Sequence, residues 1–360
     1  MLRWVQIILI QGCCAKYLTQ IKSPLIIQIP RPTFLNPSTR ETILQPVFIA
    51  ASIALISLVI GVESLQNQNL FWGPLHDSAH TYAMFLITWL LLQLFSSAAS
   101  NESIDEQSVK ATNSVVIIGG VFLAGIAIEI IQPYFGRSAS FLDIYYNLVG
   151  ISCAGGVFAL SRRKEPAKTR HVAAYIGITL LLASSLFLPI LGAYTLRAQD
   201  QSLPKLLDFE DTWQQRLWRA GGTGLASLIE APSGWEENKS TALQITFNPG
   251  KYPGFNFAHP PKNWSKYSHL SLEVFSKNDS AHKLTLRIHD DAHSQDYADR
   301  FNKTLEIKRG LNKIEIPLSE IQNAPNSRAM ALDEIAGMAL FMVQPEGSPS
   351  LYFDNLALHQ

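Results

Sequence analysis

The feature that most constrains this fold is an uncharged apolar run at residues 43–62, the first of several before residue 196. About 20 apolar residues in a helix cross a hydrocarbon core of roughly 30 Å. The further apolar runs cover residues 79–95, 114–131, 144–160 and 172–195. The sequence therefore predicts an α-helical transmembrane bundle of about five spans, formed by residues 41–200.

The pattern changes completely after residue 203. Short stretches alternate apolar and polar residues with a period of two, which is typical of half-buried β-strands. These stretches are residues 269–275, 283–290, 304–310, 313–318 and 350–358. No cysteine lies beyond Cys153, so this part has no disulfide and must be held by its core. Residues 203–360 are predicted to form an all-β domain, an antiparallel sandwich.

Composition supports this division into two parts. The chain is 47% hydrophobic and only 16% charged, because long apolar runs are joined to a half of ordinary composition. It carries 29 basic and 29 acidic residues, a balance that offers no support for nucleic-acid binding. No nucleic-acid partner is expected.

Residues 1–40 fit neither pattern. Arg3 and the short apolar stretch before Cys13 resemble a lipoprotein-type signal, but Gln11 departs from the usual small residue. The stretch is too short to span a membrane, and four prolines follow it. We interpret residues 1–40 as a cytoplasmic leader, or as the product of a start codon assigned too far upstream.

Lysine and arginine counts predict the orientation of the bundle. Basic residues cluster before the first run and between the fourth and fifth runs: Arg3, Lys16, Lys22, Arg31, Arg40, Arg162, Arg163, Lys164, Lys168 and Arg170. The loop at residues 63–77 has none. We therefore expect an inner-membrane protein with a cytoplasmic N-terminus and, after five spans, a periplasmic C-terminal domain.

Polar residues gather at the predicted outer ends of these helices. They are Asp77, His80, Glu129, Gln132, Arg137, Asp143 and Asn147. Polar groups at membrane depth are costly unless they are paired inside the protein. The cluster therefore indicates either interhelical hydrogen bonding or a site at which a carboxylate acts as general acid or base. A metal held by His76 and His80 with a carboxylate is a third alternative.

The same residues carry a family resemblance. Glu129, Gln132, Gly136, Arg137, Asp143, Asn147 and Gly150, with His80 on an earlier helix, resemble the pattern of the VanZ-like membrane family. The resemblance covers roughly residues 71–160. It implies a membrane domain but specifies no reaction.

The C-terminal half resembles the jelly-roll carbohydrate-binding modules of the galactose-binding type. LLDFED at 206–211, GLNKIEIPLSEI at 310–321 and LYFDNLAL at 351–358 carry this resemblance. It implies a structural Ca²⁺ where the first and last strands meet, with Glu210 and Asp354 as ligands; ordinary polarity at a sheet edge is the alternative. No other cofactor is expected.

One connection of this domain, residues 287–303, is rich in groups that bind hydroxyls. The candidate ligand-binding residues are His289, Asp290, Asp291, Tyr297, Asp299, Arg300 and Asn302. A solvated loop is the alternative, since loops carry binding sites but are also simply polar. Four aromatic residues either offer stacking surfaces for a ligand or belong to the hydrophobic core: Trp235, Tyr252, Trp264 and Tyr267.

Together these features predict an envelope-associated membrane protein that presents a glycan-binding sandwich, with membrane lipid and a glycan or cell-wall polysaccharide as partners. The alternative is a membrane enzyme that acts on a lipid-linked or cell-wall substrate through the outer-face cluster. Transport is less favoured because no inverted repeat is evident.

Overall fold

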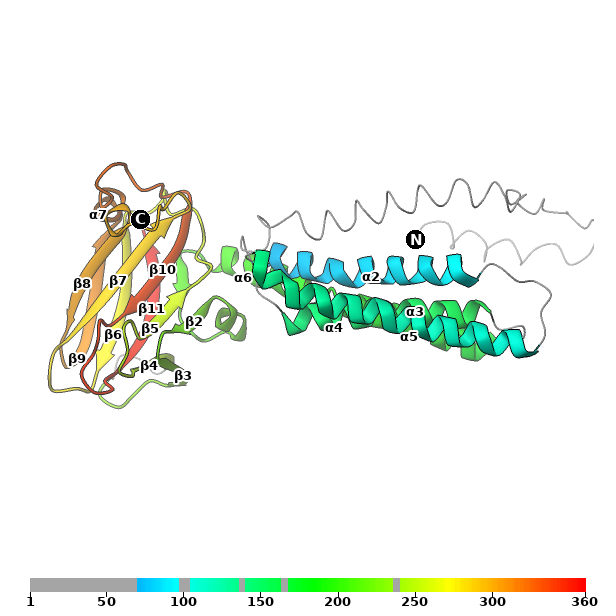
Figure 1. Cartoon of the computed structure of the whole chain (residues 1–360). Coiled ribbons are helices and arrows are strands. Elements are labelled where there is room, and N and C mark those ends of the chain that lie inside the picture. The colour runs from blue at the N-terminus through cyan, green and yellow to red at the C-terminus, as the bar shows by residue number, and fades with distance from the viewer. Residues whose placement is uncertain (1–69, 97–103, 136–139, 163–167, 236–239) are drawn as a thin grey trace, which may run out of the picture. The chain divides into compact units, whose positions relative to one another are not determined.

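The computed structural model describes residues 70–96, 104–135, 140–162, 168–235 and 240–360. The predicted leader, the first predicted span at 43–62 and the loop that contains Arg137 lie outside these residues. The described chain consists of a helical part and a β-sandwich, which we treat separately (Figure 1).

The helical part contains the predicted apolar runs in longer helices. α2 (Trp72–Ser96), α3 (Ile104–Ile131) and α4 (Phe141–Ser161) are each long and apolar enough to cross a membrane. α3 continues into the short 3-10 helix η2 (Gln132–Phe135), and α4 begins with the side chain of Ser140 accepting a hydrogen bond from the backbone N–H of Leu142.

The predicted run at 172–195 is not one continuous helix. It is divided between α5 (Lys168–Ser184) and α6 (Phe187–Ser202), with a bend of 47° at the break. The two helices are long and apolar enough to cross a membrane only when they are taken together. Pro189 explains the break, because a proline lacks an N–H and its ring clashes with the carbonyl four residues earlier, here that of Ser185. The described residues thus contain three candidate spans, or four if the bent pair is one, by length and composition only.

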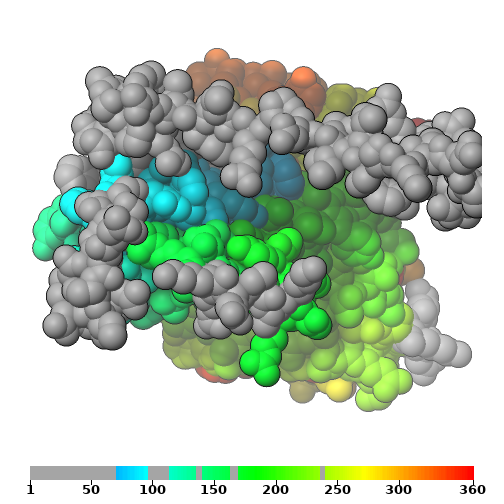
Figure 2. All heavy atoms as spheres, turned by 90° about the vertical axis from the view of Figure 1, so that its right-hand side faces the viewer, coloured from blue at the N-terminus to red at the C-terminus, as the bar shows by residue number. Residues whose placement is uncertain are grey.

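Small residues let these helices approach closely. A Cβ placed on Gly150 of α4 would lie 2.1 Å from the carbonyl oxygen of Thr81 on α2, so only glycine fits there. Figure 2 shows the blue and cyan atoms of α2 packed directly against green atoms of later helices, in agreement with the contacts between α2 and α4.

Two antiparallel sheets form the C-terminal domain, as predicted. The six-stranded sheet has the order β3-β4-β11-β6-β9, with β1 paired to β11. Its strands are β1 (Lys205–Leu207), β3 (Gly224–Glu230), β4 (Thr241–Phe247), β6 (His269–Ser276), β9 (Gly310–Pro317) and β11 (Ser350–His359). First and last strands are therefore neighbours.

The five-stranded sheet has the order β2-β5-β10-β7-β8. Its strands are β2 (Trp218–Gly221), β5 (Gly254–Phe257), β7 (His282–Asp290), β8 (Phe301–Ile307) and β10 (Ile335–Phe341). The short helices η3 (Thr212–Arg216), η4 (Tyr297–Asp299) and α7 (Leu318–Gln322) lie in the connections. Figure 1 shows the two layers of strands.

One predicted strand, 304–310, has the wrong limits. β8 ends at Ile307 and β9 begins at Gly310, so the predicted strand runs through a turn. The side chain of Asn312 closes this turn by accepting a 2.9 Å hydrogen bond from the backbone N–H of Lys308, and Gly310 has a φ of +87° that favours glycine.

The core lies between the sheets. Leu284, Leu286 and Ile288 of β7 point inward and are fully buried, and Trp264 joins them with its indole N–H donating to the carbonyl of Pro261. Trp235 is buried and stacks on Phe275. Both tryptophans are therefore core residues rather than stacking surfaces for a ligand.

Candidate functional site

A polar row crosses the outer face of the five-stranded sheet. The register places Arg219 of β2 opposite Asn256 of β5, Asn256 opposite Ala339 of β10, Ala339 opposite Arg287 of β7, and Arg287 opposite Asn302 of β8. Side chains alternate between the faces of a strand, so these residues, each next to a residue that packs into the core, point away from the core. Together they make one continuous surface across every strand of the sheet.

Small residues of β10 form the middle of this surface. Ala339 stands in the row, and Gly337 lies opposite His289 one step along the sheet. A Cβ on Gly337 would lie 2.5 Å from Cε1 of His289, so the imidazole lies directly over the glycine. We call this part of the outer face, formed by Gly337 and Ala339 with His289 and Arg287 beside them, the trough.

Cationic groups surround the trough. Burial first, and then the neighbouring charges of Arg287, His293 and Arg300, lower the pKa of His289 to about 4, so this imidazole is neutral at pH 7. Burial and the nearby Arg300 lower the pKa of Arg287. At the other end of the row, burial and Arg219 lower the pKa of His259. Arginines thus dominate the electrostatic potential of this face.

Several polar atoms at the trough have no protein partner in the described part of the chain. They are Nε of Arg287, Nε of Arg300, Nδ1 of His289 and Oδ1 of Asn302, all inaccessible or nearly so. A buried polar group without a partner costs free energy comparable to a lost hydrogen bond. Because these atoms are concentrated on one face, they indicate a surface at which a polar ligand supplies the missing hydrogen-bond partners.

Aromatic rings stand at the two ends of this surface. Phe341 occupies the outward position two residues beyond Ala339 and contacts Tyr252 edge to face, with 5.5 Å between ring centroids. At the opposite end Tyr297 is 71% exposed, and the guanidinium carbon of Arg300 lies 5.3 Å from its ring centroid. Exposed rings of this kind stack on apolar faces of a ligand.

Two of the predicted ligand residues are engaged within the protein instead. Arg328 makes a bidentate pair with the carboxylate of Asp290, at 2.5 and 2.7 Å, and its Nε donates to Asp299 at 2.6 Å. Burial alone would raise the pKa of Asp290, but the hydrogen bonds from Arg328 and the N–H of Ala331 outweigh it and lower that pKa. The same arginine and the N–H of Ser294 hold the pKa of Asp299 at about 2. This clamp fixes the connection between β7 and β8.

The predicted set is thus divided by the structure. His289, Arg300 and Asn302 lie on the trough, and Tyr297 stands at its end. Asp290 and Asp299 belong to the clamp, and Asp291 pairs with Lys262 at 2.5 Å. None of these placements tests ligand binding, which stays a prediction for the whole set.

Sequence reasoning missed Arg219, Asn256, Arg287, Gly337 and Ala339 as members of the surface. Alternation along β7 was a usable signal for one of them, because Arg287 shares the face of His289 two residues away. The others come from strands that are distant in sequence, and only the pairing of β2, β5 and β10 brings them together.

The predicted calcium ligands do approach one another through the first residues of β4. Glu210 accepts a 2.6 Å hydrogen bond from the backbone N–H of Thr241, and Asp354 accepts one of 3.3 Å from the hydroxyl of Ser240. Calcium takes six to eight oxygen ligands. Over residues 70–360, apart from the undescribed gaps, no three His, Cys, Asp or Glu side chains are placed to hold a metal ion. Two carboxylates at one strand end fit part of a calcium shell, and the ion stays a prediction.

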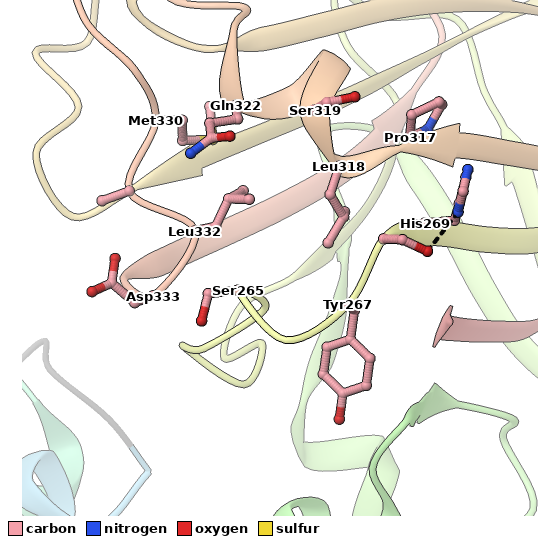
Figure 3. A pocket seen from close by; sticks show the side chains of 12 residues that line it. Ser265, Tyr267, His269, Pro317, Leu318, Ser319, Gln322, Met330, Leu332 and Asp333 are labelled. Atoms are coloured by element: carbon pink, nitrogen blue, oxygen red, sulfur yellow. Dashed lines mark hydrogen bonds between the residues drawn. The ribbon is translucent and has the colours of Figure 1, made fainter. Parts of the chain in front are cut away.

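A separate hollow of about 650 Å³ lies at the start of β6, the end of β9 and the chain before β10 (Figure 3). Figure 3 shows Tyr267, His269, Gln322, Met330 and Asp333 around it, with the hydroxyl of Ser268 bonded to the ring of His269. Of the candidate residues it contains only Tyr267, which was predicted as a stacking surface or core, and it lacks the concentration of unpaired polar atoms found on the trough.

The predicted helical cluster is buried. Glu129 and Gln132 at the end of α3, Asp143 and Asn147 near the start of α4, and His80 of α2 are each at most 6% exposed. The backbone N–H of Ser140 donates to Oε2 of Glu129 at 3.4 Å, which ties the end of α3 to the start of α4.

Histidines of the same helix do not complete a metal site. The rings of His76 and His80 lie 6.2 Å apart, and Nδ1 of His76 is 3.8 Å from the carboxylate of Asp77. No third ligand joins them among the described residues. Arg137 lies outside the described residues, so its pairing with Glu129 and Asp143 stays a prediction.

The family match concerns the C-terminal part of the chain. Residues 198–360 match the family model described as carbohydrate binding domain, family 11. No curated protein matches the chain.

Several solved structures are similar to this part. A family 11 carbohydrate-binding module from Clostridium thermocellum, in complex with a β-1,3-1,4-mixed-linked tetrasaccharide, is 20% identical over 43% of this chain and 94% of its own, with a TM-score of 0.34. An exo-β-agarase is 16% identical over 43% of this chain and 24% of its own, with a TM-score of 0.35. A family 28 module specific for non-crystalline cellulose is 15% identical over 44% of this chain and 94% of its own, with a TM-score of 0.32.

The C-terminal half combines the predicted β-sandwich with a sequence match over its whole length. Residues 198–360 thus match the carbohydrate binding domain of family 11 in sequence, and the described part of them forms an antiparallel β-sandwich.

Proposed function

We propose that this chain is a multi-pass membrane protein that holds a glycan-binding domain outside the cytoplasm and binds an envelope or cell-wall polysaccharide. The observation that carries the proposal is the trough on the outer face of the five-stranded sheet. Its unpaired polar atoms and terminal aromatic rings suit a ligand made of linked hydroxyl-bearing rings. The family match of residues 198–360 supports the same ligand class.

Membrane anchoring is the second part of this proposal. The apolar helices α2, α3 and α4 support it, as does the resemblance of residues 71–160 to VanZ-like membrane proteins. The two clusters of basic residues support a cytoplasmic N-terminus and an extracytoplasmic C-terminal domain. A reporter fused after Gln360 should be active only as an extracytoplasmic reporter. Activity only in the cytoplasm would refute the topology and the access to envelope glycans.

Glycan binding is tested with the full-length protein in nanodiscs on a broad glycan array. Tyr297→Ala and Arg300→Ala should weaken binding to the preferred glycan while leaving the melting temperature nearly unchanged, since both side chains reach the surface. Unchanged affinity in both variants would place the site elsewhere. No binding to any glycan would refute the proposal.

A second candidate function is a membrane enzyme that acts on a lipid-linked or cell-wall substrate. The observation that favours it is the burial of the carboxylates Glu129 and Asp143 beside His80, Gln132 and Asn147. Glu129→Gln keeps the shape of the side chain and removes its charge. It should abolish the cellular phenotype without lowering the amount of protein in the membrane. Wild-type behaviour of Glu129→Gln and of Asp143→Asn would reduce the cluster to interhelical hydrogen bonds.

A further inference from the structure

We infer that the ligand of the trough is an acidic glycan, one whose sugars carry carboxylate or sulfate groups. This inference rests on the proposed glycan binding and adds the chemical class of the glycan.

The outward positions around the trough contain no carboxylate. The central row consists of Arg219, Asn256, Ala339, Arg287 and Asn302. The row on one side of it contains Gly337 and His289, with Arg300 just before β8. The row on the other side consists of Gly221, Gly254, Phe341, Thr285 and Thr304. The nearest outward carboxylate on this sheet is Glu306, which stands opposite Lys283 beyond these rows. Residues 203–360 as a whole carry 19 acidic and 16 basic side chains. The face is therefore positively charged although the domain as a whole carries more acidic than basic side chains.

Two of the other three arginines of the domain pair with carboxylates, whereas Nε of the third, Arg216 of η3, has no hydrogen-bond partner among the described residues. Arg328 pairs with Asp290 and Asp299, and Arg309 pairs with Asp279. Arg219, Arg287 and Arg300 make no salt bridge with any carboxylate of the described residues. Arg287 and Arg300 even lie close enough for Arg300 to lower the pKa of Arg287. Two like charges held together without a counter-charge are stabilised when an anion binds between them.

The hydrogen-bonding capacity of the face also matches an anion. A guanidinium has five N–H donors and no acceptor, and it meets a carboxylate or sulfate with two parallel hydrogen bonds. The acceptors in the central row are limited to the side-chain amides of Asn256 and Asn302. A neutral sugar presents hydroxyls that must donate as well as accept, whereas carboxylate and sulfate oxygens only accept. The central row, rich in donors and poor in acceptors, is therefore complementary to the charged groups of an acidic sugar.

The spacing of the charges fits a polymer that crosses the strands. Arg219 and Arg287 are three strands apart, which is about 14 Å at the usual spacing of neighbouring strands. Arg300 directly precedes β8, the strand next to the β7 of Arg287. A glycan chain lying along the row, across the strands, would thus meet the guanidiniums of Arg287 and Arg300 at one place and that of Arg219 farther on. Tyr297 and Phe341 would then lie on either side of the glycan.

The test compares ligands that differ only in charge. Full-length protein in nanodiscs of neutral lipid is titrated with a polyuronate, with the same polyuronate after complete methyl esterification, with a sulfated galactan, and with its desulfated form. We expect at least one acidic polymer to bind 10-fold or more tighter than its neutral counterpart, with an affinity that falls steeply as salt is raised. Equal or tighter binding of the neutral forms would overturn the inference and leave the proposed glycan binding intact.

Variants show whether the arginines of the face cause the difference. Arg287→Gln and Arg219→Gln should each weaken binding of the acidic polymer by 5-fold or more and weaken any binding of the neutral form by a smaller factor. Arg309→Gln removes one positive charge from the exposed turn between β8 and β9 and should have no effect. Equal affinities for all three variants and the wild type would overturn the inference.

Two further outcomes are informative. Poly-glutamate that binds as tightly as the polyuronate would overturn the inference, because charge alone and not an acidic sugar would then suffice. A complete absence of glycan binding refutes the proposed function, and the inference fails with it.

Discussion

The clamp around Arg328 allows a quantitative prediction about the connection that carries Tyr297 and Arg300. Replacement of Arg328 by alanine leaves the carboxylate of Asp290, whose side chain is 0% exposed, without its bidentate partner. Breaking a buried pair in this way costs about 3 to 5 kcal/mol. We expect the lower end, about 3 kcal/mol, since the side chain of Arg328 is 26% exposed and Asp290 keeps its 2.8 Å hydrogen bond from Ala331.

In a domain of this size a loss of about 3 kcal/mol lowers the melting temperature by roughly 6 to 12 °C. Unfolding of the sandwich can be followed by the fluorescence of its buried tryptophans in the full-length protein. Arg309→Ala is the matched control, because Arg309 and Asp279 form an exposed pair that contributes at most about 1 kcal/mol. The double variant Asp290→Leu/Arg328→Leu should recover part of the loss, since it leaves no unpaired charge. A change of less than about 1 kcal/mol for Arg328→Ala would refute the reasoning.

The same clamp makes the sandwich sensitive to acid. The pKa of Asp299 is about 2 in the folded protein and the pKa of Asp290 is also lowered, whereas an unfolded aspartate has a pKa of about 3.9. The stabilisation is therefore complete above about pH 4 and is lost as the pH falls towards 2. Melting temperatures between pH 5 and pH 2 should show this loss in the wild type and a smaller one in Arg328→Ala; parallel curves would contradict it. On the trough, Gly337→Val should displace the imidazole of His289, fill the surface over β10 and weaken glycan binding at least 10-fold, measured by calorimetric titration. Since the obstructing group is a side chain near the surface, the melting temperature should change little, and a variant with wild-type affinity would place the glycan away from β10.

Much of the sandwich could be predicted from the sequence because several of its strands alternate apolar and polar residues. β6, β7, β9 and β11 were predicted within a few residues. The alternation of burial is regular in β7, whereas β11 is buried at four successive positions, 351–354. β5 and β10 were missed because apolar residues and glycines stand on their outward side, where Gly254, Gly337 and Ala339 replace the expected polar residues. Those small residues belong to the trough, so the feature that hid the strands is also part of the proposed binding surface.

The candidate site was predicted only in part, for a related reason. A cluster that lies within one connection, such as residues 289–302, is visible in a sequence. The partner of Asp290 is Arg328, 38 residues away, and β2 and β5, which supply Arg219 and Asn256 to the row of Arg287, are not neighbours of β7 in the sheet. Sequence spacing cannot distinguish a carboxylate that binds a ligand from one that pairs with a distant arginine. In the helical part, the buried polar residues were found because charged groups are conspicuous in apolar runs.

The most direct test of the central claim is hydroxyl-radical footprinting of the full-length protein with and without a bound glycan. Oxidation of aromatic side chains reports their access to solvent. A glycan on the outer face of the five-stranded sheet should protect Tyr252, which is 49% exposed, and Tyr297, and leave Tyr267 in the separate hollow unchanged. Protection of Tyr267 with no change at Tyr252 and Tyr297 would contradict the account and move the site to the hollow beside β6.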